Sequence, residues 1–154
     1  MLNDGDTVPA LSIHTDDGGR LALPPKDRPV VLYFYPKDDT SGCTIEAKDF
    51  NSLSQAFGAA GVTVVGVSPD SVESHVKFKK KHDLHLTLAA DTDKAAAEAF
   101  GVWIEKSMYG RKYMGVDRST FIIDKRGRIL RSWRKVKVAG HAEAVLAAVR
   151  ELVG

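Results

Sequence analysis

The sequence predicts an α/β domain in which a mixed β-sheet lies between helices. Apolar, β-branched and aromatic runs of strand length alternate along the chain with segments of helical periodicity. A length of 154 residues, with 44% hydrophobic and 27% charged residues, suits one globular domain that needs no disulfide or structural metal to hold its core. No repeat or linker interrupts the pattern, so we expect a single domain over residues 1–154.

The first half of the chain predicts a β-hairpin and then a strand–helix–strand unit. Residues 11–14 and 20–23 flank an Asp-Asp-Gly-Gly turn, and Asp and Gly tolerate the positive φ of hairpin turns. Residues 30–35 form a continuous apolar run, typical of a central strand that is covered on both faces. Helical spacing starts at Cys43 and ends at two glycines, and residues 62–67 repeat the buried-strand pattern. These two buried strands should pair in parallel through a right-handed crossover.

The second half predicts further helices and an antiparallel hairpin. Lys125-Arg126-Gly127 is a turn between two strand-like runs. The expected elements are helices at about 71–81, 91–100 and 142–152 and strands at 86–89, 119–124 and 129–138. Together the two halves predict a thioredoxin-like fold, with a mixed central sheet flanked by helices and an N-terminal β-hairpin.

Charge and composition argue against several classes of partner. There are 22 basic and 20 acidic residues, a balance that does not favour nucleic acid or an anionic membrane as the main partner. No apolar stretch has the length of a membrane span, and the N-terminus lacks the pattern of a signal peptide. We therefore expect a cytoplasmic protein. The chain has one cysteine, so it cannot form an internal disulfide.

Histidine and aromatic residues in the middle of the chain have plain interpretations. We expect His75, His82 and His85 to lie on a solvated surface, because no carboxylate cluster accompanies them at the spacing of metal ligands. The sequence thus predicts neither a metal site nor a cofactor. Trp103 and Tyr109 lie in a stretch that we expect to be irregular, where they either line a pocket or only pack.

The chemistry-bearing segment covers residues 35–46, where a central strand ends and a helix begins. Sites in open α/β sheets lie beyond the carboxyl ends of the strands. Cys43 is at or near the helix N-terminus, where free N–H groups and the helix dipole favour a thiolate, the reactive form of cysteine. Glu46, one turn later, can orient a cation, and Arg118 is the best candidate for that cation.

The run Pro36-x-x-x-Thr40-x-x-Cys43 resembles the peroxiredoxin active-site motif, and the residues around it resemble the bacterioferritin comigratory protein or peroxiredoxin Q branch. Residues 3–9, 65–70 and 113–124 also resemble this branch, so the resemblance covers essentially the whole chain. It implies a thiol-specific peroxidase that reduces hydrogen peroxide and organic hydroperoxides, in antioxidant defence and redox homeostasis.

The resemblance also implies residue roles. Cys43 would be the peroxidatic nucleophile, oxidised to a sulfenic acid. Thr40 and Arg118 would bind and polarise the peroxide, Pro36 would shield the thiolate, and Glu46 would support Arg118. Three of these residues have plainer alternatives: Cys43 as an inert buried cysteine, Glu46 as a solvated helix residue, and Arg118 as a surface arginine paired with a neighbouring aspartate.

One departure from the branch concerns the reductive half of the cycle. Many members carry a resolving cysteine five residues after the first, where this chain has Lys48, and others carry it in the next helix. A one-cysteine mechanism follows, in which an external thiol (thioredoxin, glutaredoxin with glutathione, or a small thiol) or Cys43 of a second copy reduces the sulfenic acid. Members of this branch are often monomers, which we also expect here.

Two other functions compete with a peroxidase. A redox sensor that relays oxidation to a partner would need no peroxide-handling groups such as Thr40 and Arg118. A disulfide oxidoreductase of thioredoxin fold is disfavoured, since the chain has no Cys-x-x-Cys pair.

Overall fold

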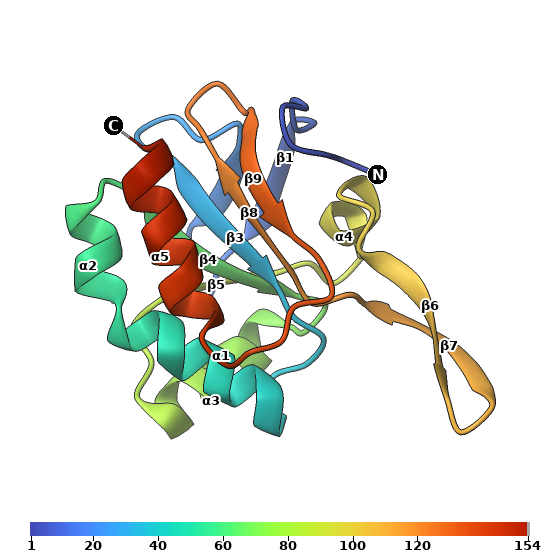
Figure 1. Ribbon diagram of the computed structural model, residues 1–154. Coiled ribbons are helices and arrows are strands. Elements are labelled where there is room, and N and C mark those ends of the chain that lie inside the picture. The colour runs from blue at the N-terminus through green and yellow to red at the C-terminus, as the bar shows by residue number, and fades with distance from the viewer. Residues whose placement is uncertain (154) are drawn as a thin grey trace.

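The computed structural model describes residues 1–153 and has a five-stranded sheet with helices packed against it (Figure 1). The strands are β1 (Leu11–His14), β2 (Arg20–Leu23), β3 (Val30–Phe34), β4 (Thr63–Ser68), β5 (Thr87–Ala90), β6 (Trp103–Met108), β7 (Arg111–Val116), β8 (Ser119–Ile123) and β9 (Ile129–Trp133). The helices are α1 (Ser41–Ser52), α2 (Ser54–Ala59), α3 (Val72–His82), α4 (Ala95–Ala99) and α5 (His141–Leu152). The predicted thioredoxin-like α/β fold and its N-terminal hairpin β1–β2 are confirmed.

The central sheet is mixed, with strand order β5-β4-β3-β8-β9. Strands β3, β4 and β5 run parallel, whereas β8 pairs antiparallel with β3, and β9 with β8. Leu32 on β3 lies between Val65 on β4 and Phe121 on β8. All five residues of β3 are buried, as expected for a strand covered on both faces.

Two hydrophobic cores lie on opposite faces of this sheet. On one face Tyr33 stacks on Phe50 of α1, with ring centroids 4.6 Å apart, and α2, α3 and α5 complete the layer. On the other face Phe34 packs on Phe100 and Phe121, and the hairpin β1–β2 and α4 cover them. The carboxyl end of β3 therefore leaves the sheet between two packed layers, and α1 begins there (Figure 1).

The stretch around Trp103 and Tyr109 was expected to be irregular, and this expectation is wrong. Residues 103–116 form the hairpin β6–β7, which projects from the body of the molecule (Figure 1). Its turn residues Tyr109 and Gly110 have φ of 51° and 77°, as a two-residue type I′ turn requires. A tyrosine at positive φ is uncommon, so Gly110 was the only residue of this pair that indicated a turn, and the hairpin was not predicted.

Two predicted helices have different limits in the structure. The helix expected over residues 91–100 begins only at Ala95, because the Asp91 carboxylate accepts hydrogen bonds from the amides of Ala96 and Ala97. The helix that follows Cys43 is divided into α1 and α2 at Leu53, whose φ of −99° and ψ of 7° leave the helical region. None of the helices within residues 1–153 is long and apolar enough to cross a bilayer.

We predict that Gly66→Ala destabilises the fold by about 1–3 kcal/mol, because the new methyl group would overpack the core. An ideal Cβ at Gly66 lies 2.6 Å from Cζ of Tyr33 and 2.8 Å from Cδ2 of Leu88, and both side chains are fully buried. Urea denaturation measures the effect. Gly58→Ala is the control: it adds a methyl group in α2 with no atom within 4 Å and should stabilise by up to about 1 kcal/mol. Equal stability of the two variants would contradict the prediction.

Candidate active site

Cys43 lies in the first turn of α1, directly after the loop that leaves β3. It is the third residue of the helix, and the first backbone bond of the helix runs from the amide of Thr44 to the carbonyl of Thr40, at 2.8 Å. The amides before Thr44 therefore have no intrahelical acceptor and face the start of the helix. A negative sulfur is favoured at this position, and Cys43 is 2% exposed.

Arg118 joins Cys43 to Glu46 from the segment between β7 and β8. Its Nη2 donates to Sγ of Cys43 at 3.2 Å, and its Nη1 donates to Oε1 of Glu46 at 2.6 Å. Gly42 permits this approach, because a Cβ there would lie 3.3 Å from Nη2. The guanidinium thus contacts a thiol and a carboxylate that are one helical turn apart, rather than pairing with a neighbouring aspartate.

Glu46 is not a solvated helix residue, since it is 1% exposed. Burial raises the pKa of its carboxyl from 4.5 to about 7, and the charge and hydrogen bond of Arg118 oppose that rise only in part. Its second oxygen, Oε2, has no hydrogen-bond partner among the described residues. Burial lowers the pKa of Arg118, but the charges and hydrogen bonds of Glu46 and Cys43 together raise it by more, so the guanidinium stays charged.

Thr40 and Pro36 lie on the same loop as Cys43 but make different contacts. Thr40 occupies the N-cap position of α1 with an extended backbone, but its hydroxyl accepts no hydrogen bond from an amide of the helix and instead donates to the carbonyl of Lys37 at 2.9 Å. Pro36 is half-buried, directly after the fully buried Tyr35. The five residues singled out from the sequence thus come from one strand–loop–helix unit and from the start of β8.

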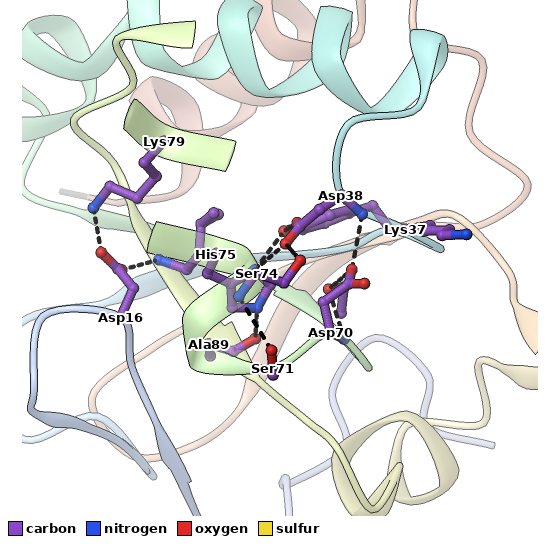
Figure 2. A network of polar contacts seen from close by, with 12 residues as sticks. Asp16, Lys37, Asp38, Asp70, Ser71, Ser74, His75, Lys79 and Ala89 are labelled. Atoms are coloured by element: carbon purple, nitrogen blue, oxygen red, sulfur yellow. Dashed lines mark hydrogen bonds and ion pairs between the residues drawn. The ribbon is translucent and has the colours of Figure 1, made fainter. Parts of the chain in front are cut away.

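Asp38 on this loop contacts Tyr35, Asp70 and His75, a polar group that was not recognised in the sequence. Asp38 is buried, and its carboxylate accepts from the Tyr35 hydroxyl at 2.6 Å. The same carboxylate lies 2.7 Å from Nδ1 of His75 (Figure 2). The solvated surface expected for His75 is therefore wrong, because this ring is fully buried on α3. Of the other two histidines, His85 is exposed and His82 is half-buried against Asp39 at 2.7 Å.

Asp38, Asp70 and His75 also lie at metal-ligand distances, with one atom of each within 4.8 Å of the others. The cluster could not be recognised in the sequence, because its three members come from separate segments of the chain. The three residues already bond to one another and to nearby donors, as in the bond of the Asp38 amide to Oδ2 of Asp70 at 2.8 Å. The absence of a metal stays a prediction.

The hairpin β6–β7 adds one further charge near the site, which sequence reasoning missed. Burial lowers the pKa of Lys106, and its charge interacts with those of Asp117, Arg118 and Cys43. Tyr109, at the tip of the hairpin, is 99% exposed and therefore does not pack against the body of the protein. Trp103, at the base, packs under the ammonium group of Lys94, which is 5.4 Å from the ring centroid.

Comparison with known proteins agrees with this geometry. The profile of the AhpC/TSA family matches residues 5–132. Peroxiredoxin Bcp of Bacillus subtilis is 46% identical over 149 residues, which are 96% of this chain and 95% of that protein. A structure of Xanthomonas campestris peroxiredoxin Q superimposes with a TM-score of 0.88 at 45% identity and covers 94% of this chain and 92% of the other.

The chain belongs to the AhpC/TSA family. Within it, these similarities identify a peroxiredoxin of the Bcp or peroxiredoxin Q group, as the active-site motif had suggested. A second Xanthomonas campestris structure, of the bacterioferritin comigratory protein, has a TM-score of 0.89 at 41% identity and covers 97% of this chain and all of the other.

We predict that the wild-type protein loses stability relative to the Glu46→Gln variant as the pH rises from about 4.5 to about 7. The folded-state pKa of about 7 lies above the ordinary 4.5, so the folded protein holds an extra proton in this window. The stabilising contribution is complete below the lower value and is lost as the pH passes the upper one. Urea denaturation at about pH 5 and about pH 7.5 should show a relative loss on the order of 1–3 kcal/mol. A difference between the two proteins that does not change with pH would contradict the prediction.

Proposed function

We propose that Cys43 is the peroxidatic residue of a thiol-dependent peroxidase and that a thiol from another molecule returns it to the reduced state. The single observation that carries the proposal is the contact of Arg118 with both Cys43 and Glu46 at the start of α1. Peroxiredoxins as a class reduce peroxides at the expense of thiols, and this chain is a member of that class.

In the oxidative step the Sγ thiolate of Cys43 attacks one oxygen of the peroxide. An S–O bond forms and the O–O bond breaks, so the sulfur loses two electrons and becomes a sulfenic acid. The other oxygen leaves with those electrons, takes a proton, and departs as water or an alcohol. Arg118 can stabilise both the Cys43 thiolate and the peroxide. Its charge favours the thiolate, and its N–H groups can donate to the peroxide oxygens as negative charge moves onto them.

Thr40 and Pro36 have supporting parts in this proposal. Thr40 has given its hydrogen to the carbonyl of Lys37, so its oxygen is left to accept the O–H of a hydroperoxide. Pro36 is proposed to keep bulk water from the thiolate. Glu46 is proposed to hold the guanidinium in place through the 2.6 Å contact.

The reductive half uses an external thiol, because Cys43 is the only cysteine of the chain. One thiol attacks the sulfenic sulfur, releases water and forms a mixed disulfide, and a second thiol then frees Cys43 and leaves as part of a disulfide. Lys48, where many relatives of this branch carry a cysteine, lies exposed on α1. A cytoplasmic location and a monomeric state stay predictions.

The substrates that we propose are hydrogen peroxide and organic hydroperoxides. The structural study of the Xanthomonas campestris bacterioferritin comigratory protein concerns its alkyl peroxide reduction activity. The similar chain and the same fold support an organic substrate here as well.

We predict that Cys43→Ser abolishes peroxide consumption, because a serine hydroxyl is not ionised at working pH. After one equivalent of peroxide, intact-mass analysis of the wild-type protein should show one added oxygen or the adduct of a sulfenic acid trap. Turnover that survives in Cys43→Ser would remove Cys43 from the mechanism.

We also predict that Arg118→Ala lowers the second-order rate constant for peroxide by about 100-fold, the usual cost of losing a donor aimed at developing charge. Arg118→Lys should recover only part of the rate, because a lysine cannot bridge Cys43 and Glu46 in the manner of a guanidinium. Arg111→Ala, at an exposed position of β7, is the matched control. Equal rates for the Arg118→Ala and Arg111→Ala variants would contradict the role of Arg118.

A coupled assay with a panel of reductants identifies the physiological thiol. Thioredoxin, glutaredoxin with glutathione, and small thiols are supplied in turn to protein that has been oxidised by peroxide. We expect at least one of them to restore the Cys43 thiol without any intramolecular disulfide. An oxidised protein that no thiol restores would contradict the one-cysteine cycle.

A further inference from the structure

We propose that His75 is a positioning residue for peroxide, which acts through Asp38 on the hydroxyl of Thr40. The inference rests on the proposed function, because it concerns how that peroxide is oriented. The proposed pathway runs from α3 and β5, through the buried cluster of Figure 2, to the loop that precedes Cys43.

The buried ring of His75 bridges two elements. Its Nε2 lies 2.9 Å from the carbonyl of Ala89 on β5, and its Nδ1 lies 2.7 Å from Oδ2 of Asp38 on the loop. A carbonyl can only accept, so Nε2 carries a hydrogen and donates it to Ala89. A second proton must lie between Nδ1 and the Asp38 carboxyl, because two lone pairs at 2.7 Å would repel each other. The ring therefore holds Asp38 at a fixed distance from β5.

Asp38 is held from several directions at once. Besides His75, its carboxylate accepts from the hydroxyl of Tyr35 at 2.6 Å and from that of Ser74 at 2.8 Å. Its backbone amide donates to Oδ2 of Asp70 at 2.8 Å, and Asp70 in turn accepts from the Ser68 hydroxyl at 2.7 Å. An acidic residue that is 8% exposed thus has hydrogen-bond partners for both its side chain and its amide.

The peptide group between Lys37 and Asp38 links the position of Asp38 to that of the Thr40 hydroxyl. The amide of Asp38 and the carbonyl of Lys37 belong to the same planar unit, so fixing the N–H on Asp70 fixes the direction of the C=O. That carbonyl accepts the Thr40 hydroxyl at 2.9 Å. The hydroxyl hydrogen of Thr40 is therefore used in the bond to Lys37, and the lone pairs of its oxygen can accept the O–H of the peroxide.

The loop needs this external support because of its own backbone. Asp39, between Asp38 and Thr40, has a φ of 60°, which costs on the order of 1 kcal/mol for a residue other than glycine. Its carboxylate contacts Lys81 and His82 of α3, but these contacts are exposed or half-buried and therefore weak. The buried bonds to Asp38 are the stronger restraint on the loop.

Replacing His75 by asparagine or by glutamine removes one of its two hydrogen bonds at a time. In His75→Asn the side-chain amide takes the place of Nδ1 and can still donate to Asp38, whereas the bond to Ala89 is lost. In His75→Gln the longer side chain places its amide near Nε2, so the bond to Ala89 survives and the bond to Asp38 is lost. The two variants remove one buried hydrogen bond each and should lose similar stability.

We expect His75→Gln to lower the second-order rate constant for peroxide by about ten-fold, and His75→Asn by less than about three-fold. The rate of Cys43 alkylation by iodoacetamide, followed across pH, should be unchanged in both, because Arg118 and the helix start are untouched. Similar losses in the two variants, or a parallel loss of alkylation rate, would mean that His75 only stabilises the fold.

A double-mutant cycle tests the route through Thr40. Thr40→Val removes the hydroxyl, so His75→Gln should cause no further loss of peroxide rate in that background. Losses that add in the double variant would overturn the proposal. A wild-type protein without peroxidase activity would instead overturn the proposed function.

Tyr35→Phe keeps the test decisive if both histidine variants fail to fold. It removes one hydrogen bond to Asp38 and leaves the buried ring in place. We expect a fall in peroxide rate that disappears in the Thr40→Val background, and an unchanged peroxide rate would count against the proposal.

Discussion

The guanidinium of Arg118 connects the sheet to the first two turns of α1 through two short contacts. One contact is to sulfur and the other to a buried carboxylate, so a single side chain adds a polar link between Cys43 and the start of β8 to the hydrophobic packing of α1 on the sheet. A buried ion pair of this kind adds little net stability, because desolvation offsets most of its Coulomb attraction. Its consequence is geometric: it places a permanent positive charge beside the only sulfhydryl of the chain.

A second set of contacts supports the same loop from the opposite side. Asp38 is bound to α3 and, through His75, to β5, whereas Arg118 acts from the start of β8. In the proposed mechanism the contacts of Asp38 govern the loop that carries Thr40, and those of Arg118 govern the sulfur. If these groups act as proposed, substitutions around Asp38 change peroxide orientation, whereas substitutions around Arg118 change the reactivity of Cys43.

Local sequence patterns were sufficient for most of the fold and for the residues of the site that lie close together in the chain. The buried run of β3 and the helix that carries Cys43 follow from periodicity, and the resemblance to peroxiredoxins extended the site to Arg118, 75 residues away. The cluster of Asp38 and His75 could not be predicted, because its contacts join segments that are 37 residues apart with no shared motif. The hairpin β6–β7 was missed because its turn begins with a tyrosine at positive φ.

The burial of Cys43 has a consequence for how long each molecule remains active. At 2% exposure the sulfur is more accessible to a small peroxide than to a thiol on a large molecule, and no second cysteine in the chain captures the sulfenic acid first. In the proposed one-cysteine cycle a second peroxide and the reductant therefore compete for the same atom. The product of that second oxidation, a sulfinic acid, is not returned by thiols. The concentration of peroxide relative to reductant thus sets the average number of turnovers before inactivation, and sustained oxidative load would consume the protein itself.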